Sequence, residues 1–168
     1  DGTDNFETRF LVNDFSCREK IPWIYGGVIG AEGRVMTVIP GKTACLRCLM
    51  PDPPAPGSVP TCDTAGVLGA AVMAVAGIQT SETIKVIIDP TQCTESRLFA
   101  FDLWDSTWKK IDLRVLSEAG CSSCHGDDHE WLDTSRHQTA VLCGQDAVQF
   151  HYPDTVSYTH LRAHETPC

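Results

Sequence analysis

Two Cys-x-x-C pairs give this chain four thiols at a spacing typical of a metal site. The first pair is Cys45 and Cys48, and the second is Cys121 and Cys124. Together they supply the four thiolates that bind zinc in tetrahedral structural sites, where no coordination position stays open to activate water. The alternative is two disulfides or four buried free thiols. The chain has nine cysteines, however, and an odd number fits a disulfide framework poorly.

Cys62 is a further cysteine whose position indicates chemistry. It immediately precedes residues 64–88, an apolar stretch rich in glycine and alanine that predicts one long helix. The positive end of a helix dipole favours a thiolate, so Cys62 is a candidate nucleophile. Taken alone, the residue fits a packing role better, because single cysteines are usually small buried residues. The small residues of the helix indicate a core position or a subunit interface.

A third set of polar residues lies near the start of the chain. Asp4 and Glu7 stand at capping-box spacing and predict the first turn of a helix. Asn5, Arg9 and Asn13 follow one another at intervals of four residues and therefore share one helix face. Such a face is suited to a polar ligand, but by residue type alone we favour a helix cap and a solvated surface.

The elements that position these residues are predicted from periodicity. Residues 21–28 form a short apolar run with two glycines, which predicts a buried, central parallel strand. Residues 34–39 predict its hairpin or meander partner, and residues 96–102 and 107–115 predict two more strands that lead to the second cysteine pair. Five prolines within residues 51–60 exclude a helix or an interior strand, so this segment is a surface loop and a candidate lid.

The last part of the chain indicates a small appendage. Residues 125–129 contain two histidines and two aspartates, which could bind a metal but are more typical of a solvated loop. Residues 139–150 predict two short strands around a glycine turn. We expect a main domain over residues 1–124 and a small module over residues 125–155. Residues 156–168 resemble translated sequencing-adapter read-through and are excluded from the fold prediction.

Composition limits the classes of function. The chain has 168 residues, 42% of them hydrophobic, which is enough for one main core. Thirteen basic and 22 acidic residues give a net charge of -9, which argues against nucleic acid as a partner. The apolar run at residues 65–78 is shorter than the roughly 20 residues that span a bilayer. With no membrane segment or signal peptide recognised, we expect a cytoplasmic protein.

With these motifs assembled, the chain resembles the ThiF/MoeB/HesA family, the bacterial relatives of ubiquitin-activating enzymes. The matching motifs are D-x-T-D-N-x-x-x-R-x-x-x-N at residues 1–13, C-x-x-C-L at 45–49, T-C-x-x-A-G-V-L-G at 61–69 and C-x-x-C at 121–124. The sequence C-G-x-D-x-V-Q at residues 143–149 is similar to the C-terminal module of some ThiF-type members.

The resemblance implies a doubly wound, Rossmann-like α/β sheet that binds ATP and magnesium, of which residues 1–124 would be the C-terminal part. Family members adenylate the C-terminal glycine of a ubiquitin-like sulfur carrier that ends in Gly-Gly, and we expect a homodimer. The reaction is attack of the carrier carboxylate on the α-phosphate, with pyrophosphate leaving. The thiamine and molybdenum-cofactor pathways are not separable from these residues, although the C-terminal module favours the ThiF type.

The resemblance also assigns residue roles. Asp4 would face magnesium and the phosphates, since a hard cation takes oxygen ligands. Asn5 would be its neighbour in the nucleotide site, and Arg9 would support the polyphosphate. Cys62 matches the cysteine that some members use to receive the activated carrier as a thioester or acyl disulfide, whereas other members finish at the adenylate.

The family's glycine-rich nucleotide turn, which precedes these motifs, is not found in the chain, so we expect this fragment to be inactive and the activity to belong to the intact protein. An alternative is a non-catalytic, zinc-stabilised module that docks a ubiquitin-like partner. Retention of Asp4 argues against that alternative. A third possibility, adenylation of a tRNA base, fits the acidic charge poorly.

Overall fold

The computed structural model describes residues 6–55, 58–91, 93 and 95–132, together with the backbone of three short strands near the end of the chain. In chain order the elements are α1 (Phe6–Glu19), β1 (Trp23–Ile29), β2 (Glu32–Val38), α2 (Leu46–Leu49), α3 (Cys62–Ala65), α4 (Gly69–Ile88), β3 (Arg97–Asp102), β4 (Thr107–Asp112), α5 (Arg114–Glu118), the 3-10 helix η1 (Glu130–Leu132), and the short strands β5 (Ala140–Leu142), β6 (Ala147–Gln149) and β7 (Leu161–Arg162). The α/β class predicted from the sequence is confirmed.

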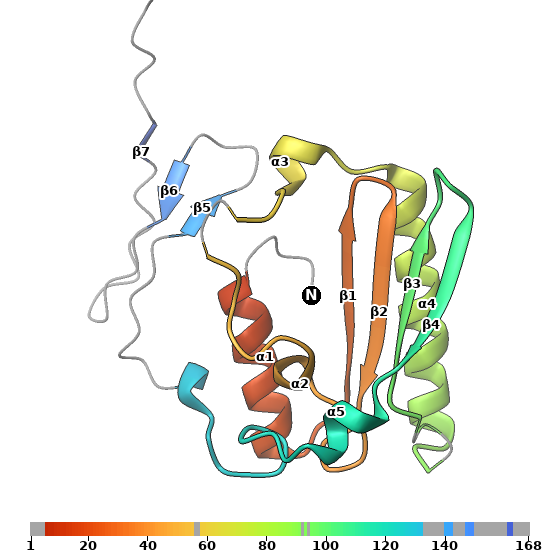
Figure 1. Cartoon of the computed structure of the whole chain (residues 1–168), viewed down its shortest axis with the longest axis vertical. Coiled ribbons are helices and arrows are strands. Elements are labelled where there is room, and N and C mark those ends of the chain that lie inside the picture. The colour runs from red at the N-terminus through yellow and green to blue at the C-terminus, as the bar shows by residue number, and fades with distance from the viewer. Residues whose placement is uncertain are drawn as a thin grey trace, which may run out of the picture.

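The main sheet has four strands in the order β1-β2-β3-β4 (Figure 1), and every neighbouring pair is antiparallel. The β1–β2 connection is tight, with Gly30 at a φ of 57°, so the two strands form a hairpin. The hairpin predicted at residues 34–39 is confirmed. The central parallel strand predicted at residues 21–28 is wrong for the described sheet, because a short connection reverses the chain whereas parallel neighbours need a long crossover.

Helices and loops cover both faces of this sheet (Figure 1). On one face, Val35 of β2 and Phe101 of β3 pack against Ala71 and Val75 of α4. On the other face, Met36 and Val38 of β2 join a cluster with Phe10 of α1, the cysteine-bearing loops and Trp131 of η1. Alternate residues of β2 therefore serve the two cores, as the two-residue period of a strand requires. The chain thus forms three layers, with the cysteine loops beside α1.

The helix predicted at residues 64–88 is broken into α3 and α4. Gly66 has a φ of 70° and a ψ of 179°, a conformation that only glycine adopts readily. The backbone there pairs with Gly30, which donates its N–H to the Gly66 carbonyl at 3.0 Å and accepts from the Leu68 N–H at 2.8 Å. A contact with the β1–β2 turn therefore replaces helical hydrogen bonds, and one continuous helix is excluded.

The long helix α4 is more exposed than the sequence suggested. It is 20 residues long, with a mean hydropathy of 1.4 in a window of which 17% is buried, so by length and composition it would be able to cross a membrane. The apolar run at residues 65–78, on which the sequence-based prediction relied, is shorter than this helix. In the structure, Ala71 and Val75 pack on the sheet, and buried Glu82 accepts a hydrogen bond from Thr37 at 3.0 Å and pairs with Lys85. The helix is therefore fixed to the sheet by one face.

The two strands predicted at residues 96–102 and 107–115 are confirmed as β3 and β4, although residues from Arg114 onward form α5. The two strands predicted at residues 139–150 are confirmed as β5 and β6, which form a small sheet with β7. Most of the tail at residues 156–168 lies outside the described residues.

Candidate metal centre and surrounding residues

The four cysteines of the two Cys-x-x-C pairs converge on one point beside α1. Cys45 immediately precedes α2 and Cys48 lies within it, while Cys121 and Cys124 follow α5. Each pair folds into a tight turn, with Cys48 N–H donating to the Cys45 carbonyl at 3.1 Å and His125 N–H donating to the Cys121 carbonyl at 3.0 Å. The sequence supplies these turns locally, and the sheet brings the two turns together.

The sulfur positions fit a tetrahedral zinc ion. Cys45 Sγ lies 3.8 Å from both Cys48 Sγ and Cys121 Sγ, and Cys48 Sγ lies 3.5 Å from Cys124 Sγ. All four sulfurs lie within 4.8 Å of one another. Ligands of a regular tetrahedron with Zn–S bonds of about 2.3 Å are about 3.8 Å apart. The described cysteines are free thiols, so the disulfide alternative is not supported by these residues.

Hydrogen bonding within the cluster divides the thiols into two kinds. Hydrogen bonds from Cys121, Cys124, Cys17 and Cys48 hold the pKa of Cys45 far below its usual value. A hydrogen bond from Cys124 lowers the pKa of Cys121 to about 6. The thiols of Cys48 and Cys124, which donate, have raised pKa values because hydrogen bonding to Cys121 stabilises their protonated forms. Cys45 and Cys121 are thus the more acidic thiols of the cluster, and Cys48 and Cys124 the less acidic ones.

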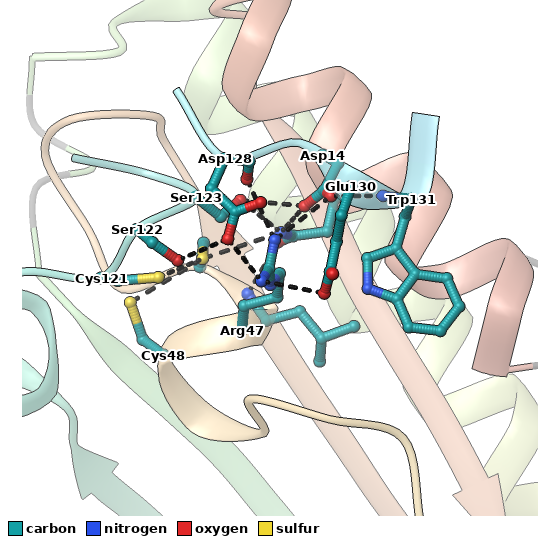
Figure 2. A network of polar contacts seen from close by, with 12 residues as sticks. Asp14, Arg47, Cys48, Cys121, Ser122, Ser123, Asp128, Glu130 and Trp131 are labelled. Atoms are coloured by element: carbon teal, nitrogen blue, oxygen red, sulfur yellow. Dashed lines mark hydrogen bonds and ion pairs between the residues drawn. The ribbon is translucent and has the colours of Figure 1, made fainter. Parts of the chain in front are cut away.

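A charged network adjoins the metal site on the side of α1 (Figure 2). Arg47, between the first two cysteines, bonds Asp14 at 3.4 Å, Asp128 at 3.1 Å and Glu130 at 3.3 Å. Arg47 is 9% exposed and Asp14 is fully buried. Burial alone would lower the pKa of Arg47, but Asp14 and Asp128 outweigh it and raise that pKa. The network therefore joins a buried Arg47–Asp14 pair to two more exposed carboxylates, Asp128 and Glu130.

The histidine- and aspartate-rich loop at residues 125–129 forms no metal site of its own in the described part of the chain. The one described group of three or more metal-binding side chains that meet at a point is the four-cysteine cluster. His125 Nδ1 lies 3.2 Å from Cys124 Sγ, and Asp128 belongs to the Arg47 network. These residues therefore surround the cysteine site, a role that their sequence pattern did not indicate.

The structure places the other predicted site residues only in part. Asp4 and Asn5 lie outside the described residues. Arg9 lies on α1, and its guanidinium carbon is 5.1 Å from the ring centre of Phe6 and 6.0 Å from that of Tyr25. Asn13, which shares the Arg9 face in the sequence, is fully buried against the cysteine loops. The solvated face that we favoured is therefore wrong at Asn13.

Cys62 begins α3, which is a single turn of four residues. Thr61 caps this turn through a complete capping box with Thr64. The Cys62 thiol is half-buried and lies 4.0 Å from the Val28 carbonyl at the end of β1. Because α3 is separated from α4, the dipole of a long helix does not act directly on Cys62, and that part of the sequence argument is corrected.

The ThiF family matches residues 1–123 of the chain. The four-cysteine α/β architecture and this match together define the class, and the chain belongs to the ThiF family.

Similar proteins include the sulfur carrier protein ThiS adenylyltransferase of Bacillus subtilis, which is 40% identical over 89% of this chain and 44% of its own length. The SAMP-activating enzyme E1 of Haloferax volcanii is 37% identical over 77% of this chain and 50% of its own length. The sulfur carrier protein adenylyltransferase of Thermus thermophilus is 33% identical over 96% of this chain and 54% of its own length. The chain thus spans about half the length of these relatives.

Among solved structures, the crystal structure of Escherichia coli MccB with MccA-N7isoASN is similar in fold, with a TM-score of 0.51 and 15% sequence identity. It covers 68% of this chain, which covers 36% of MccB. At this level of identity the similarity concerns the fold alone.

Proposed function

We propose that this chain is part of an enzyme that adenylates the C-terminal glycine of a ubiquitin-like sulfur carrier at the expense of ATP. The observation that carries the proposal is the 33 to 40% identity to three relatives, two of them named as adenylyltransferases of sulfur carriers and the third as a SAMP-activating enzyme. In the proposed reaction a carboxylate oxygen of the carrier attacks the α-phosphorus of ATP. The bond to the bridging oxygen breaks, and pyrophosphate leaves.

The proposed nucleotide residues belong to the start of the chain and to α1. Asp4 would supply an oxygen ligand to magnesium, and Asn5 would lie beside it in the nucleotide site. Arg9, whose guanidinium lies over the rings of Phe6 and Tyr25, would add positive charge near the phosphates. A carrier with a C-terminal Gly-Gly is the proposed partner, and the proposed location is the cytoplasm.

Cys62 is the proposed acceptor of the activated carrier. Its thiolate would attack the acyl carbon of the adenylate, forming a thioester and releasing AMP. The half-buried thiol at the end of the loop that begins at Pro51 supports this role, because the loop could then cover the carrier tail. The zinc ion proposed at the four cysteines would be structural, since four thiolates leave it no open position.

The test is isotope exchange of pyrophosphate into ATP, assayed on the complete reading frame with and without a carrier ending in Gly-Gly. We expect exchange only with the carrier, and loss of exchange in Asp4→Ala. Cys62→Ala should keep the exchange but lose the covalent carrier adduct detected by mass spectrometry. The matched control is Cys93→Ala, because Cys93 is also a half-buried thiol outside the metal cluster.

Each result separates one part of the proposal from the rest. Carrier binding without any exchange would favour the alternative of a non-catalytic docking module. If pyrophosphate exchange in Asp4→Ala equals that of the wild type, Asp4 is only a helix cap. An adduct that survives Cys62→Ala and disappears in Cys93→Ala would show that Cys93, and not Cys62, is the acceptor.

A further inference from the structure

Two adjacent buried polar residues of α1 contact both cysteine turns of the metal site at once. Asn13 and Asp14 are fully buried, although one is an amide and the other a carboxylate. Such groups are retained in a protein interior only when they are hydrogen-bonded. Their partners lie far away in the sequence, on the loops that carry the cysteines, so their bonds join segments that the chain itself does not hold together.

Asn13 connects the first cysteine turn to the second. Its Oδ1 accepts the N–H of Leu46, the residue after Cys45, at 2.8 Å. Its Nδ2 donates to Ser123 Oγ, in the second cysteine pair, at 3.4 Å, and lies 3.7 Å from Cys45 Sγ. The amide therefore bonds one residue within each Cys-x-x-C and also points a donor at a ligand sulfur.

Asp14 also connects the two cysteine turns, through a charged carboxylate (Figure 2). Its Oδ1 accepts the Ser123 hydroxyl at 2.9 Å, and its Oδ2 lies 3.4 Å from Arg47 Nη1. The Trp131 N–H, in η1, donates to the same Oδ2 at 3.2 Å. One carboxylate thus contacts residues from the first cysteine turn, the second cysteine turn and the segment that follows it.

We infer that Asn13 and Asp14 are positioning residues of the metal centre, which hold the two cysteine turns at ligand spacing and join them to α1. A metal gains affinity when its ligands are already in place, and partners outside the ligand shell typically change metal affinity by about 10- to 100-fold. The coupling is reciprocal, so the metal should in turn stabilise α1. Because α1 also carries Arg9, the metal would fix the helix next to the proposed nucleotide residues.

This inference rests on the proposed zinc site and not on the adenylation chemistry. The decisive measurement is the zinc dissociation constant of the full chain, obtained by competition with a chromophoric chelator. Ser123→Ala removes the hydroxyl that bonds Asn13 and Asp14, and we expect zinc to bind about tenfold more weakly. Ser122→Ala is the matched control, because this exposed neighbour lies in the same Cys-x-x-C and bonds only Asp128 among the described contacts. We expect it to change the constant by less than about twofold.

A second pair of variants separates positioning from general stability. Asp14→Asn and Glu82→Gln each remove the charge of a buried, ion-paired carboxylate, but Glu82 lies on α4, on the opposite face of the sheet from the cysteines. Asp14→Asn should weaken zinc binding at least tenfold, and Glu82→Gln should leave it unchanged. Equal losses in both variants would overturn the inference, because the effect would then be global.

Hydrogen exchange supplies a readout that does not depend on activity. Adding zinc to the chelated wild-type chain should slow exchange of α1 amides around Asn13, and this protection should be reduced in Ser123→Ala. Exchange of α1 that is unaffected by zinc would overturn the inference. Absence of zinc binding in the wild-type chain would instead remove the zinc site itself, so the two failures are distinguishable.

Discussion

At the scale of single residues, the four clustered thiols differ in acidity. Cys45 and Cys121 have lowered pKa values, the latter about 6, because neighbouring thiols donate hydrogen bonds to their sulfurs. Cys48 and Cys124, as donors, have raised pKa values. Metal ligation needs all four as thiolates, so binding must remove the protons that remain.

We therefore predict that zinc binding to the metal-free chain at pH 7 releases about two protons, those of Cys48 and Cys124. At pH 5, below the Cys121 pKa of about 6, Cys121 is also protonated and the count should rise to about three. Affinity should fall as pH falls, since protons compete for the sulfurs. Calorimetry in buffers of different ionisation enthalpy gives the count. Release of about four protons at pH 7 would show that the four thiols titrate alike.

At the scale of elements, the break between α3 and α4 depends on the backbone of one residue. Gly66 combines a φ of 70° with a ψ of 179°, and a Cβ atom added there would meet no atom within 4 Å. Any cost of adding a side chain is therefore conformational and not steric crowding by neighbours. The break matters because it separates the capped helix α3, which begins at Cys62, from α4, and the Cys62 thiol lies 4.0 Å from the Val28 carbonyl of β1.

Gly66→Ala should lower the free energy of unfolding by about 1 to 3 kcal/mol, the usual cost of a non-glycine residue in this backbone region. Gly77→Ala is the matched control, since Gly77 lies inside α4 and its added methyl group also meets nothing within 4 Å. It should raise the free energy of unfolding by about 0.5 to 1 kcal/mol, because alanine is the better helix former. Urea titrations measure both. Equal effects of the same sign would mean that Gly66 is not a required break.

At the scale of the whole molecule, the outer face of α4 leaves apolar side chains in water. Met73 is 78% exposed, Ile87 76% and Ile88 77%, while the opposite face of the helix packs on the sheet. Exposed apolar area of this kind favours association, at roughly 25 cal/mol for each square ångström removed from water. The homodimer that we expect from the family resemblance would have a suitable surface here, with a second copy as its occupant.

We predict that the chain self-associates as its concentration rises, and that Ile87→Lys shifts it toward the monomer. Val115→Lys introduces the same charge at an equally exposed apolar residue, 79% accessible but on α5, and should leave association unchanged. Sedimentation velocity over a range of concentrations distinguishes the two variants. Association that is equally weakened by both variants would point to charge repulsion, and association weakened by neither would place the interface elsewhere.

The sequence by itself determined the four cysteines that meet in one cluster, the class of the fold and the family. A Cys-x-x-C turn is a local structure, so its spacing is visible in the chain, and two turns supply the complete ligand set of a four-coordinate ion. The hairpin at residues 34–39 and the strands at 96–102 and 107–115 were also predicted, the last of them three residues too long, because alternation of polar and apolar residues is a local property.

Only the tertiary structure decided how these parts meet. Asn13 follows the pattern of a solvated helix face, yet Asn13 and its neighbour Asp14 are buried because Ser123 and Arg47, distant in the sequence, supply hydrogen bonds to them. The continuous helix predicted at residues 64–88 is interrupted because the backbone near Gly66 pairs with Gly30. Helix periodicity and residue type depend only on residues that are close together in the sequence. A distant segment can bury a polar residue or end a helix. Neither helix periodicity nor residue type predicts such an effect, because its cause lies elsewhere in the chain.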